Sequence, residues 1–128
     1  MKQMLKLLVI LFSFCSLTAC EEEFDTSTIT GKWELVEVLA DPGDGSGTYK
    51  PYEGSQVMTI HADSTIHFTE SYCFTQGGVD GKTAVIDGQN IYWADCNMTY
   101  PFELKDGHLF IYPPCIEPCG EKFQKIGD

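Results

Sequence analysis

Short segments in which apolar and polar side chains alternate make up most of this 128-residue sequence, and they constrain the fold more than any other feature. The clearest segment runs from Asn97 to Leu104, with Asn97, Thr99 and Glu103 on one face. The opposite face is apolar and carries Met98, Tyr100, Phe102 and Leu104. A period of two residues is typical of a half-buried β-strand. Pro101 suggests a break or a bulge in the hydrogen-bond ladder of this strand, because proline has no amide hydrogen.

Similar alternation marks seven further segments, and no long stretch has the spacing of an amphipathic helix. The eight predicted strands are Lys32 to Leu39, Gln56 to His61, Thr65 to Tyr72, Lys82 to Ile86, Asn90 to Ala94, Asn97 to Leu104, His108 to Tyr112 and Glu121 to Ile126. Turn-forming residues lie between them. The pattern predicts an all-β domain, either an antiparallel sandwich or an antiparallel barrel.

Three of the predicted connections are tight, namely residues 62–64, 87–89 and 105–107. If consecutive strands alternate in direction, these three turns fall at one end of the domain. The longer connections, residues 40–55, 73–81, 95–97 and 113–120, then fall at the opposite end. The topology therefore predicts one closed end and one end that carries the long loops.

Four cysteines, Cys73, Cys96, Cys115 and Cys119, lie in or beside the long loops. An even number of cysteines in an exported protein indicates disulfides, which help a small core to hold together. We predict the pairs Cys73–Cys96 and Cys115–Cys119, although crossed pairs are geometrically possible because all four thiols share one end. A zinc site is the alternative, but the spacing of Cys115 and Cys119 differs from the usual CxxC knuckle.

The first nineteen residues have the three parts of a secretory signal peptide. Lys2 and Lys6 give a positive start, residues 7–15 are almost wholly apolar, and small residues follow. The apolar run is well short of the ~20 residues that cross a bilayer as a helix. Leu17-Thr18-Ala19-Cys20 resembles the lipobox of bacterial lipoproteins. That resemblance implies that residues 1–19 are removed and that Cys20 becomes a lipidated first residue; an ordinary signal peptide is the alternative.

Residues 20–29 are predicted to tether a single domain, residues 30–128, to the membrane. Glu21, Glu22 and Glu23 resemble the acidic signal that sends some Gram-negative lipoproteins to the cell surface, or they form a solvated linker. We therefore expect an outer membrane lipid anchor, with the acyl chains on Cys20 in the bilayer. The length of the rest of the chain fits one domain, and we expect a monomer.

The formal net charge is −11, and the chain contains no arginine. Nucleic-acid binding needs a basic patch that can neutralise phosphates. This composition therefore excludes nucleic acid as an expected partner, and it favours solubility over any specific cationic partner.

Gly31-Lys32-Trp33 at the start of the first strand resembles the Gly-x-Trp motif of lipocalins. Together with the lipobox, "DPGDGSGTY" at 41–49 and "CIEPCGEKFQKI" at 115–126, it makes the chain similar to the small lipocalin-like lipoproteins of Gram-negative bacteria. The resemblance covers roughly residues 29–126 and implies an eight-stranded antiparallel up-and-down barrel whose tryptophan closes the base. The chain is shorter than true lipocalins and has no C-terminal helix after the barrel.

Eight-stranded barrels either fill their interior with side chains or hold one small ligand. The expected inward set is bulky: Trp33, Leu35, Met58, Ile60, Ile66, Phe68, Ile91, Trp93, Met98, Tyr100, Phe102, Leu104, Leu109, Ile111 and Phe123. The strand directions bring five candidate ligand-binding residues to the open end: Met58, Tyr72, Trp93, Met98 and Tyr100. Most of these residues would equally serve as core.

No catalytic or metal-binding pattern emerges from the sequence, so we expect neither an enzyme nor a cofactor. Asp41, Asp44 and Ser46 could offer oxygens to calcium, but the loop fails the EF-hand pattern, and its residues also suit a tight loop. The three histidines, His61, His67 and His108, fall on separate strands. No serine or thiol nucleophile stands beside a plausible base. Glu70, Asp95 and Glu117 could pair only if the fold brought them together.

Two classes of function remain. The first is a membrane-anchored lipoprotein whose barrel binds a small apolar or amphipathic ligand at the cell envelope. The second is a protein-interaction or structural lipoprotein with a solid core, which acts through its rim loops. A cavity of more than about 300 Å³ at the open end would favour a ligand, and a filled barrel would favour the interaction role.

Overall fold

The computed structural model describes residues 26–73 and 80–128. The predicted signal peptide, Cys20 and the three glutamates after it lie outside the described residues. The described residues form a short 3₁₀ helix, Thr26–Thr28, and nine strands. The strands are β1 (Gly31–Ala40), β2 (Tyr49–Pro51), β3 (Val57–Ile60), β4 (Thr65–Phe68), β5 (Thr83–Asp87), β6 (Asn90–Trp93), β7 (Met98–Lys105), β8 (His108–Ile111) and β9 (Cys119–Gly127). Within these residues there is no helix long and apolar enough to cross a membrane.

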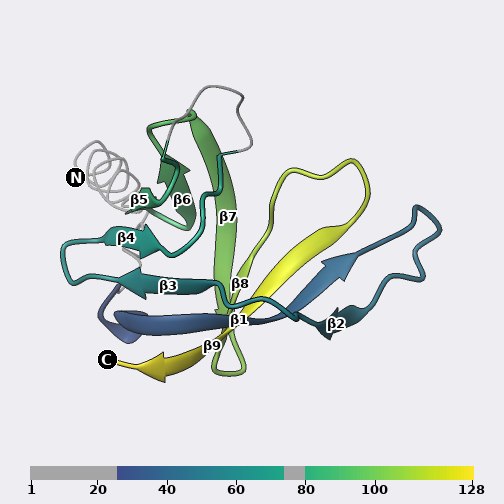
Figure 1. The fold of residues 1–128 in the computed structure, drawn as a ribbon, viewed down its shortest axis with the longest axis horizontal. Helices are drawn as coiled ribbons and strands as arrows, with labels where there is room; N and C mark the ends of the chain where they lie inside the picture. Colours follow the sequence, from purple (N-terminus) through teal and green to yellow (C-terminus); the bar gives the residue numbers. More distant parts are fainter. Residues whose placement is uncertain (1–25, 74–79) are drawn as a thin grey trace, which may run out of the picture.

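The strands form one antiparallel sheet that closes on itself (Figure 1). From β3 to β9 each strand pairs with the next along the chain, and β1 pairs with both β3 and β9. The prediction of an eight-stranded antiparallel up-and-down barrel is therefore confirmed. The ninth strand, β2, was not predicted; it pairs with residues 37–39 of β1, beyond the part of β1 that pairs with β3. It lengthens the wall of the barrel at the open end.

The three tight turns lie together at one end of the barrel, which we call the base. β7 and β8 are joined there by Asp106 and Gly107, which both have positive φ (52° and 75°). Such angles suit a two-residue turn between antiparallel strands, because they match the twist of the strands. The antiparallel pairing places the longer connections at the other end, which we call the rim. In Figure 1 the loop after β1 and the loop before β9 extend to the same side of the molecule.

Gly31 and Trp33 close the base. Gly31 has φ of 127°, and a Cβ atom on it would lie 2.5 Å from the carbonyl oxygen of Gly127, so only glycine fits this position. Trp33 is buried, and its Nε1 donates a hydrogen bond of 2.7 Å to the carbonyl oxygen of Ile29, which is also buried. The Gly-x-Trp segment thus holds the chain that enters the barrel across its closed end.

An irregularity in the pairing of β1 with β9 changes which side chains of β1 face the interior. The register shifts between Leu35 and Glu37, so that Val36 is passed over. Beyond this shift Val38 pairs with Glu121 inside the barrel, whereas Glu37 forms an ion pair of 2.5 Å with Lys122. A β-bulge re-aims side chains in this way because one extra residue on one strand breaks the alternation of faces.

The core follows the predicted inward set closely. Thirteen of the fifteen predicted residues are buried, and Met98 is half-buried against them. The structure adds Ile29, Tyr72 and Ala84 to the core. The barrel interior is therefore largely filled from the base upward, mainly by bulky apolar side chains.

One prediction for β7 was wrong. Leu104 does not belong to the core, because 39% of its side chain is exposed. The pairing of β6 with β7 ends at Pro101, so Leu104 has a neighbouring strand only on the β8 side. Pro101 itself does not break the strand, which runs on to Lys105; it takes the position at which the ladder with β6 ends.

Candidate functional site

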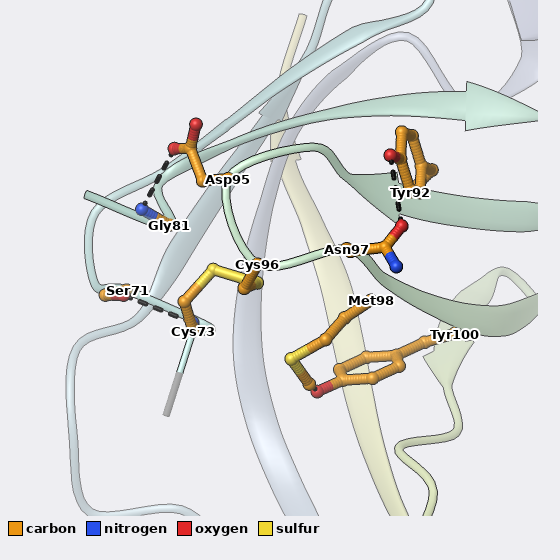
Figure 2. The surroundings of a disulfide bond; sticks show 9 residues. All are labelled: Ser71, Cys73, Gly81, Tyr92, Asp95, Cys96, Asn97, Met98 and Tyr100. Carbon is orange, nitrogen blue, oxygen red and sulfur yellow. Dashed lines mark hydrogen bonds between the residues drawn. A yellow bond between two sulfur atoms is a disulfide. The ribbon is translucent and has the colours of Figure 1, made fainter. Parts of the chain in front are cut away.

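A disulfide between Cys73 and Cys96 joins two rim connections, with a Cα–Cα distance of 5.7 Å. Figure 2 shows the disulfide and the residues around it. The amide of Gly81 donates to Asp95 Oδ2 at 3.3 Å, which links the same two connections a second time. Gly81 has φ of 55°, and a Cβ atom there would lie 2.7 Å from the Cys73 sulfur. This side of the rim is therefore held by a covalent bond and by close packing.

The second disulfide, Cys115–Cys119, closes the connection before β9, with a Cα–Cα distance of 6.0 Å. Both predicted disulfide pairs are confirmed. The carbonyl oxygen of Pro118 accepts a hydrogen bond of 3.0 Å from the amide of Asp41, so this loop lies beside the loop that follows β1. Ile116, at the tip of the disulfide loop, is fully exposed (102%).

The loop from Asp41 to Gly47 is organised by the Asp41 carboxylate. It accepts hydrogen bonds from the amides of Gly47 (2.6 Å), Gly43 (2.7 Å) and Gly45 (3.0 Å). These three donors lower the pKa of the Asp41 carboxyl, because hydrogen bonds to a carboxylate favour its charged form. The Asp44 carboxylate accepts from the amide of Ser46 at 2.9 Å. The carboxylates suggested as calcium ligands thus serve backbone donors, and the described residues contain no group of three or more His, Cys, Asp or Glu side chains that could hold a metal.

Four aromatic side chains fill the interior below the rim. Trp93 is at the centre, with ring centroids 5.4 Å from Phe68, 5.1 Å from Tyr72 and 4.8 Å from Tyr100. Nε1 of Trp93 is buried and has no hydrogen-bond partner among the described residues. These rings close the bottom of the open end, so any cavity at the rim must be shallow.

Two cavities open above this aromatic layer. The first has a volume of about 200 Å³ and we call it the Gln56 cavity; Gln56, Tyr52, Leu35 and Glu70 are among its walls. The second has a volume of about 250 Å³ and we call it the Tyr100 cavity; it is bounded by Tyr100, Leu39, Pro113 and the Cys115–Cys119 disulfide. Three residues line both cavities: Val38, Tyr72 and Glu121.

Hydrogen bonds fix the polar wall of the Gln56 cavity. Oε1 of Gln56 accepts from the hydroxyl of Thr69 and from the amide of Glu70, each at 2.8 Å. Its Nε2 donates to the carbonyl oxygen of Glu70 at 3.3 Å. Among the described residues Gln56 is the one buried polar residue, and both the oxygen and the nitrogen of its side-chain amide form hydrogen bonds. It therefore acts as a structural tie between the start of β3 and the chain after β4.

Glu121 is the charged group at the junction of the two cavities. The hydroxyl of Tyr72 donates to its Oε2 at 2.6 Å. Burial raises the pKa of the Glu121 carboxyl, and the hydrogen bond from Tyr72 opposes part of that shift. Burial and the neighbouring Glu121 raise the pKa of Tyr72 well above its ordinary value, so the hydroxyl remains a donor. The arrangement is a partly desolvated carboxylate that faces two small cavities.

The five candidate ligand-binding residues divide into two groups. Tyr72 lines both cavities and Tyr100 lines one of them. Met58 and Trp93 are wholly buried and do not border either cavity. Met98 is half-buried, with its sulfur 3.6 Å from the Tyr100 hydroxyl, and it also borders neither cavity.

Sequence reasoning missed Glu121, Gln56 and Val38 as residues of the rim interior. Glu121 has the same strand phase as the inward Phe123, and Gln56 has the same phase as the inward Met58. Alternation alone could therefore have found these two polar residues. Val38 could not have been found in this way, because the bulge at Val36 shifts the phase of β1.

The other candidate groups do not converge. His61 and His67 are exposed, and His108 lies at the base beside the turn of Asp106. Glu70 borders the Gln56 cavity, Asp95 accepts from Gly81, and Glu117 is exposed on the disulfide loop; none forms a pair with another of these acids.

The fold and this site define a closed antiparallel β-barrel with a disulfide-fixed rim and two shallow cavities that share one carboxylate. Comparisons of the chain with protein-family models, with curated proteins and with solved structures found no match.

Proposed function

We propose that this protein is a membrane-anchored lipoprotein whose lipocalin-like barrel binds a small amphipathic ligand at its rim. The observation that carries the proposal is that the two rim cavities share Tyr72 and Glu121 as lining residues. A polar group between apolar walls is typical of small-molecule sites, in which apolar surface supplies affinity and a few polar groups orient the ligand.

The size of the cavities limits the ligand. Neither cavity alone reaches the roughly 300 Å³ that we set above as favouring a ligand, at about 200 Å³ and about 250 Å³. The proposal therefore depends on the two cavities together, which adjoin through Val38, Tyr72 and Glu121. The ligand would therefore be small, or would place one part in each cavity and span Glu121. Deep burial of a long chain is not part of the proposal, because the aromatic rings around Trp93 fill the barrel beneath.

A protein-interaction role through the rim loops is the second candidate. It is favoured by Ile116, a fully exposed apolar side chain on a loop that the Cys115–Cys119 disulfide constrains. The adjacent loop that starts at Asp41 would belong to the same surface. A fixed loop with an apolar tip loses little conformational entropy on binding a partner protein.

The anchor proposed for Cys20 agrees with where the barrel chain begins. β1 starts at Gly31, which pairs with Ile60 beside the tight turn after β3, so the chain before it leaves from the base. Eleven residues, from Cys20 to Thr30, can span at most about 36 Å. The base would therefore lie near the outer membrane, and the rim would point away from it.

Replacement of Cys20 by alanine tests the anchor. A single acyl chain holds a protein only marginally, whereas the lipoprotein pathway attaches more than one chain at the cysteine. We expect the wild-type protein to stay with the membrane fraction after a carbonate wash and Cys20→Ala to be released. Cys15→Ala is the matched control, because Cys15 lies in the segment that we expect to be cleaved. Retention of Cys20→Ala in the washed membranes would exclude lipidation at this residue as the anchor.

Native mass spectrometry of the protein purified from the membranes of its own host tests ligand binding. We expect a small molecule to co-purify with the wild-type chain, and to be lost from Tyr72→Ala, because Tyr72 borders both cavities. Ile116→Ala should keep the small molecule, since this side chain is outside the cavities. If no small molecule is found, and Ile116→Ala instead loses a co-purifying protein, the interaction role replaces the ligand-binding role.

A further inference from the structure

We propose that the rim site takes a small organic ammonium cation, with Glu121 as its counter-ion and tyrosine rings around it. This inference rests on the ligand-binding function proposed above and specifies the chemical class of the ligand. It is argued from the pairing of charges, the position of Glu121 between the cavities, and the side chains that surround it.

Glu121 has no cationic partner among the described residues. The two ion pairs of this part of the chain join Lys122 to Glu37 and Lys125 to Asp128. Lys122 follows Glu121 directly, but alternation along β9 puts its side chain on the other face of the strand, where it meets Glu37. The sequence contains no arginine that could reach the site. A carboxylate that is partly removed from water without a compensating cation costs free energy, which a bound cation would recover.

One oxygen of Glu121 remains open to a ligand. Oε2 accepts the Tyr72 hydroxyl at 2.6 Å, and the described residues place no hydrogen bond on Oε1. Because Glu121 borders both cavities, a donor in either of them can approach the carboxylate. An ammonium group supplies both the positive charge and the N–H donors for a charge-assisted hydrogen bond.

Tyrosine rings border both cavities. Tyr52 and Tyr72 line the Gln56 cavity, and Tyr72 and Tyr100 line the Tyr100 cavity. The face of an aromatic ring attracts a cation within about 6 Å of its centroid. Glu70, which also lines the Gln56 cavity, carries a second carboxylate. The ammonium group is therefore best placed in the Gln56 cavity, with an apolar substituent in the Tyr100 cavity between Leu39 and Pro113.

The same arrangement disfavours the other classes of amphipathic ligand. A carboxylate or a phosphate would lie beside Glu121 in a protein with a formal net charge of −11 and would be repelled. A wholly apolar ligand would displace water from Glu121 without replacing the lost hydrogen bonds. Electrostatic complementarity thus selects the cation among molecules of equal size.

Isothermal titration calorimetry with three probes of similar shape tests the inference on the purified, disulfide-bonded protein. The probes are 2-phenylethylammonium, 2-phenylethanol and 3-phenylpropionate, which share a phenyl group and differ in the charge of the polar end. At pH 7 we expect the ammonium probe to bind at least about tenfold more tightly than the alcohol, and the carboxylate probe to bind most weakly. Glu121→Gln should remove the preference for the ammonium probe, whereas the rim control Glu117→Gln should keep it.

The outcomes separate this inference from the proposed function. If the alcohol binds as tightly as the ammonium probe, or if Glu121→Gln keeps the preference, the cation assignment is overturned while ligand binding at the rim stands. If none of the probes binds, while native mass spectrometry finds a neutral or anionic molecule in the barrel, the cation assignment is again overturned and the function stands. Absence of both probe binding and any co-purifying molecule overturns both proposals.

Discussion

The base and the rim of this barrel are closed by different means. At the base, tight turns join the strands, and Trp33 packs across the end with its indole N–H bonded to the Ile29 carbonyl. At the rim, two disulfides hold longer connections, and the interior carries Gln56, Tyr72 and Glu121. Apolar packing can stabilise an end only if it fills that end. Covalent bonds hold a rim in place while leaving space inside it, so the end with less packing is the end that can bind.

The largest effect should come from Trp33→Ala, which empties the base. Removal of a buried tryptophan side chain costs about 3–5 kcal/mol, because the lost transfer free energy adds to that of the cavity. The measurement is the free energy of unfolding from urea denaturation. Ile116→Ala, at the exposed tip of the rim, is the control and should stay within about 0.5 kcal/mol of wild type. Equal losses for the two variants would contradict a stability that is concentrated at the base.

The next effect concerns the two rim disulfides. Conversion of Cys73 and Cys96 together to serine should lower the free energy of unfolding by about 3 kcal/mol, because their sequence separation of 23 residues closes a long loop in the unfolded chain. Cys115 and Cys119, separated by 4, close a much shorter loop, and their double serine variant should lose about 2 kcal/mol. The test is urea denaturation of both variants. A larger loss from the shorter loop would mean that the Cys115–Cys119 bond acts mainly through native contacts of the rim.

The strand pattern was predictable because one face of each strand is buried. The alternation of apolar and polar residues then predicts which side chains face the interior of the barrel and which face solvent. The antiparallel order follows from tight turns such as Asp106-Gly107. β2 could not be found, because Tyr49–Pro51 is too short to show a period. The exposure of Leu104 depends on where β6 ends, which is a property of the neighbouring strand and not of β7.

The rim interior was harder to predict for two physical reasons. The bulge at Val36 exchanges the inward and outward positions of β1 beyond it. Apolar residues occupy both odd and even positions around the bulge, so the alternation does not predict that Val38 faces inward. Glu121 has the correct phase, but a carboxylate is not expected inside a barrel because its burial costs free energy. Once the structure is known, the same cost makes the partly buried Glu121 carboxylate an indication of a binding site at the rim.

Glu121→Gln should change the free energy of unfolding by a smaller amount, and it should raise it, whereas Trp33→Ala lowers it. In the folded state burial raises the pKa of Glu121 above its ordinary value of 4.5. Between pH 4.5 and the raised pKa, the folded state therefore binds more protons than the unfolded state. The contribution of this group is therefore fully present below pH 4.5 and is lost as the pH rises through the raised pKa. Tyr52, Tyr72, Tyr100 and Glu70 are the other titratable residues that line the two cavities.

The neutral amide in Glu121→Gln avoids this loss. We expect Glu121→Gln to be more stable than wild type at pH 7 by about 1 kcal/mol and to flatten the fall of stability above pH 4.5. Thermal unfolding followed from pH 4 to pH 8 measures this difference, and Glu117→Gln on the exposed rim loop should follow the wild-type profile. A variant that loses stability at pH 7 would show that the ionised Glu121 is already well compensated within the protein.

The smallest effect should appear in the loop from Asp41 to Gly47, the part of the rim that no disulfide closes. The amides of Gly47, Gly43 and Gly45 lower the pKa of Asp41, so its contribution is present above pH 3.8 and is lost as the pH falls below that value. Asp41→Asn keeps the shape of the side chain and removes the charge, and hydrogen bonds to a charged acceptor are roughly twice as strong as neutral ones. We therefore expect little change in global unfolding but faster amide hydrogen exchange, by about fivefold, at these three glycines.

Asp44→Asn is the matched control. The Asp44 carboxylate accepts a hydrogen bond from one backbone amide, that of Ser46, so this substitution should change the exchange of that amide alone. Equal exchange rates in wild type and Asp41→Asn would mean that the backbone preferences of proline and glycine order this loop without the Asp41 carboxylate.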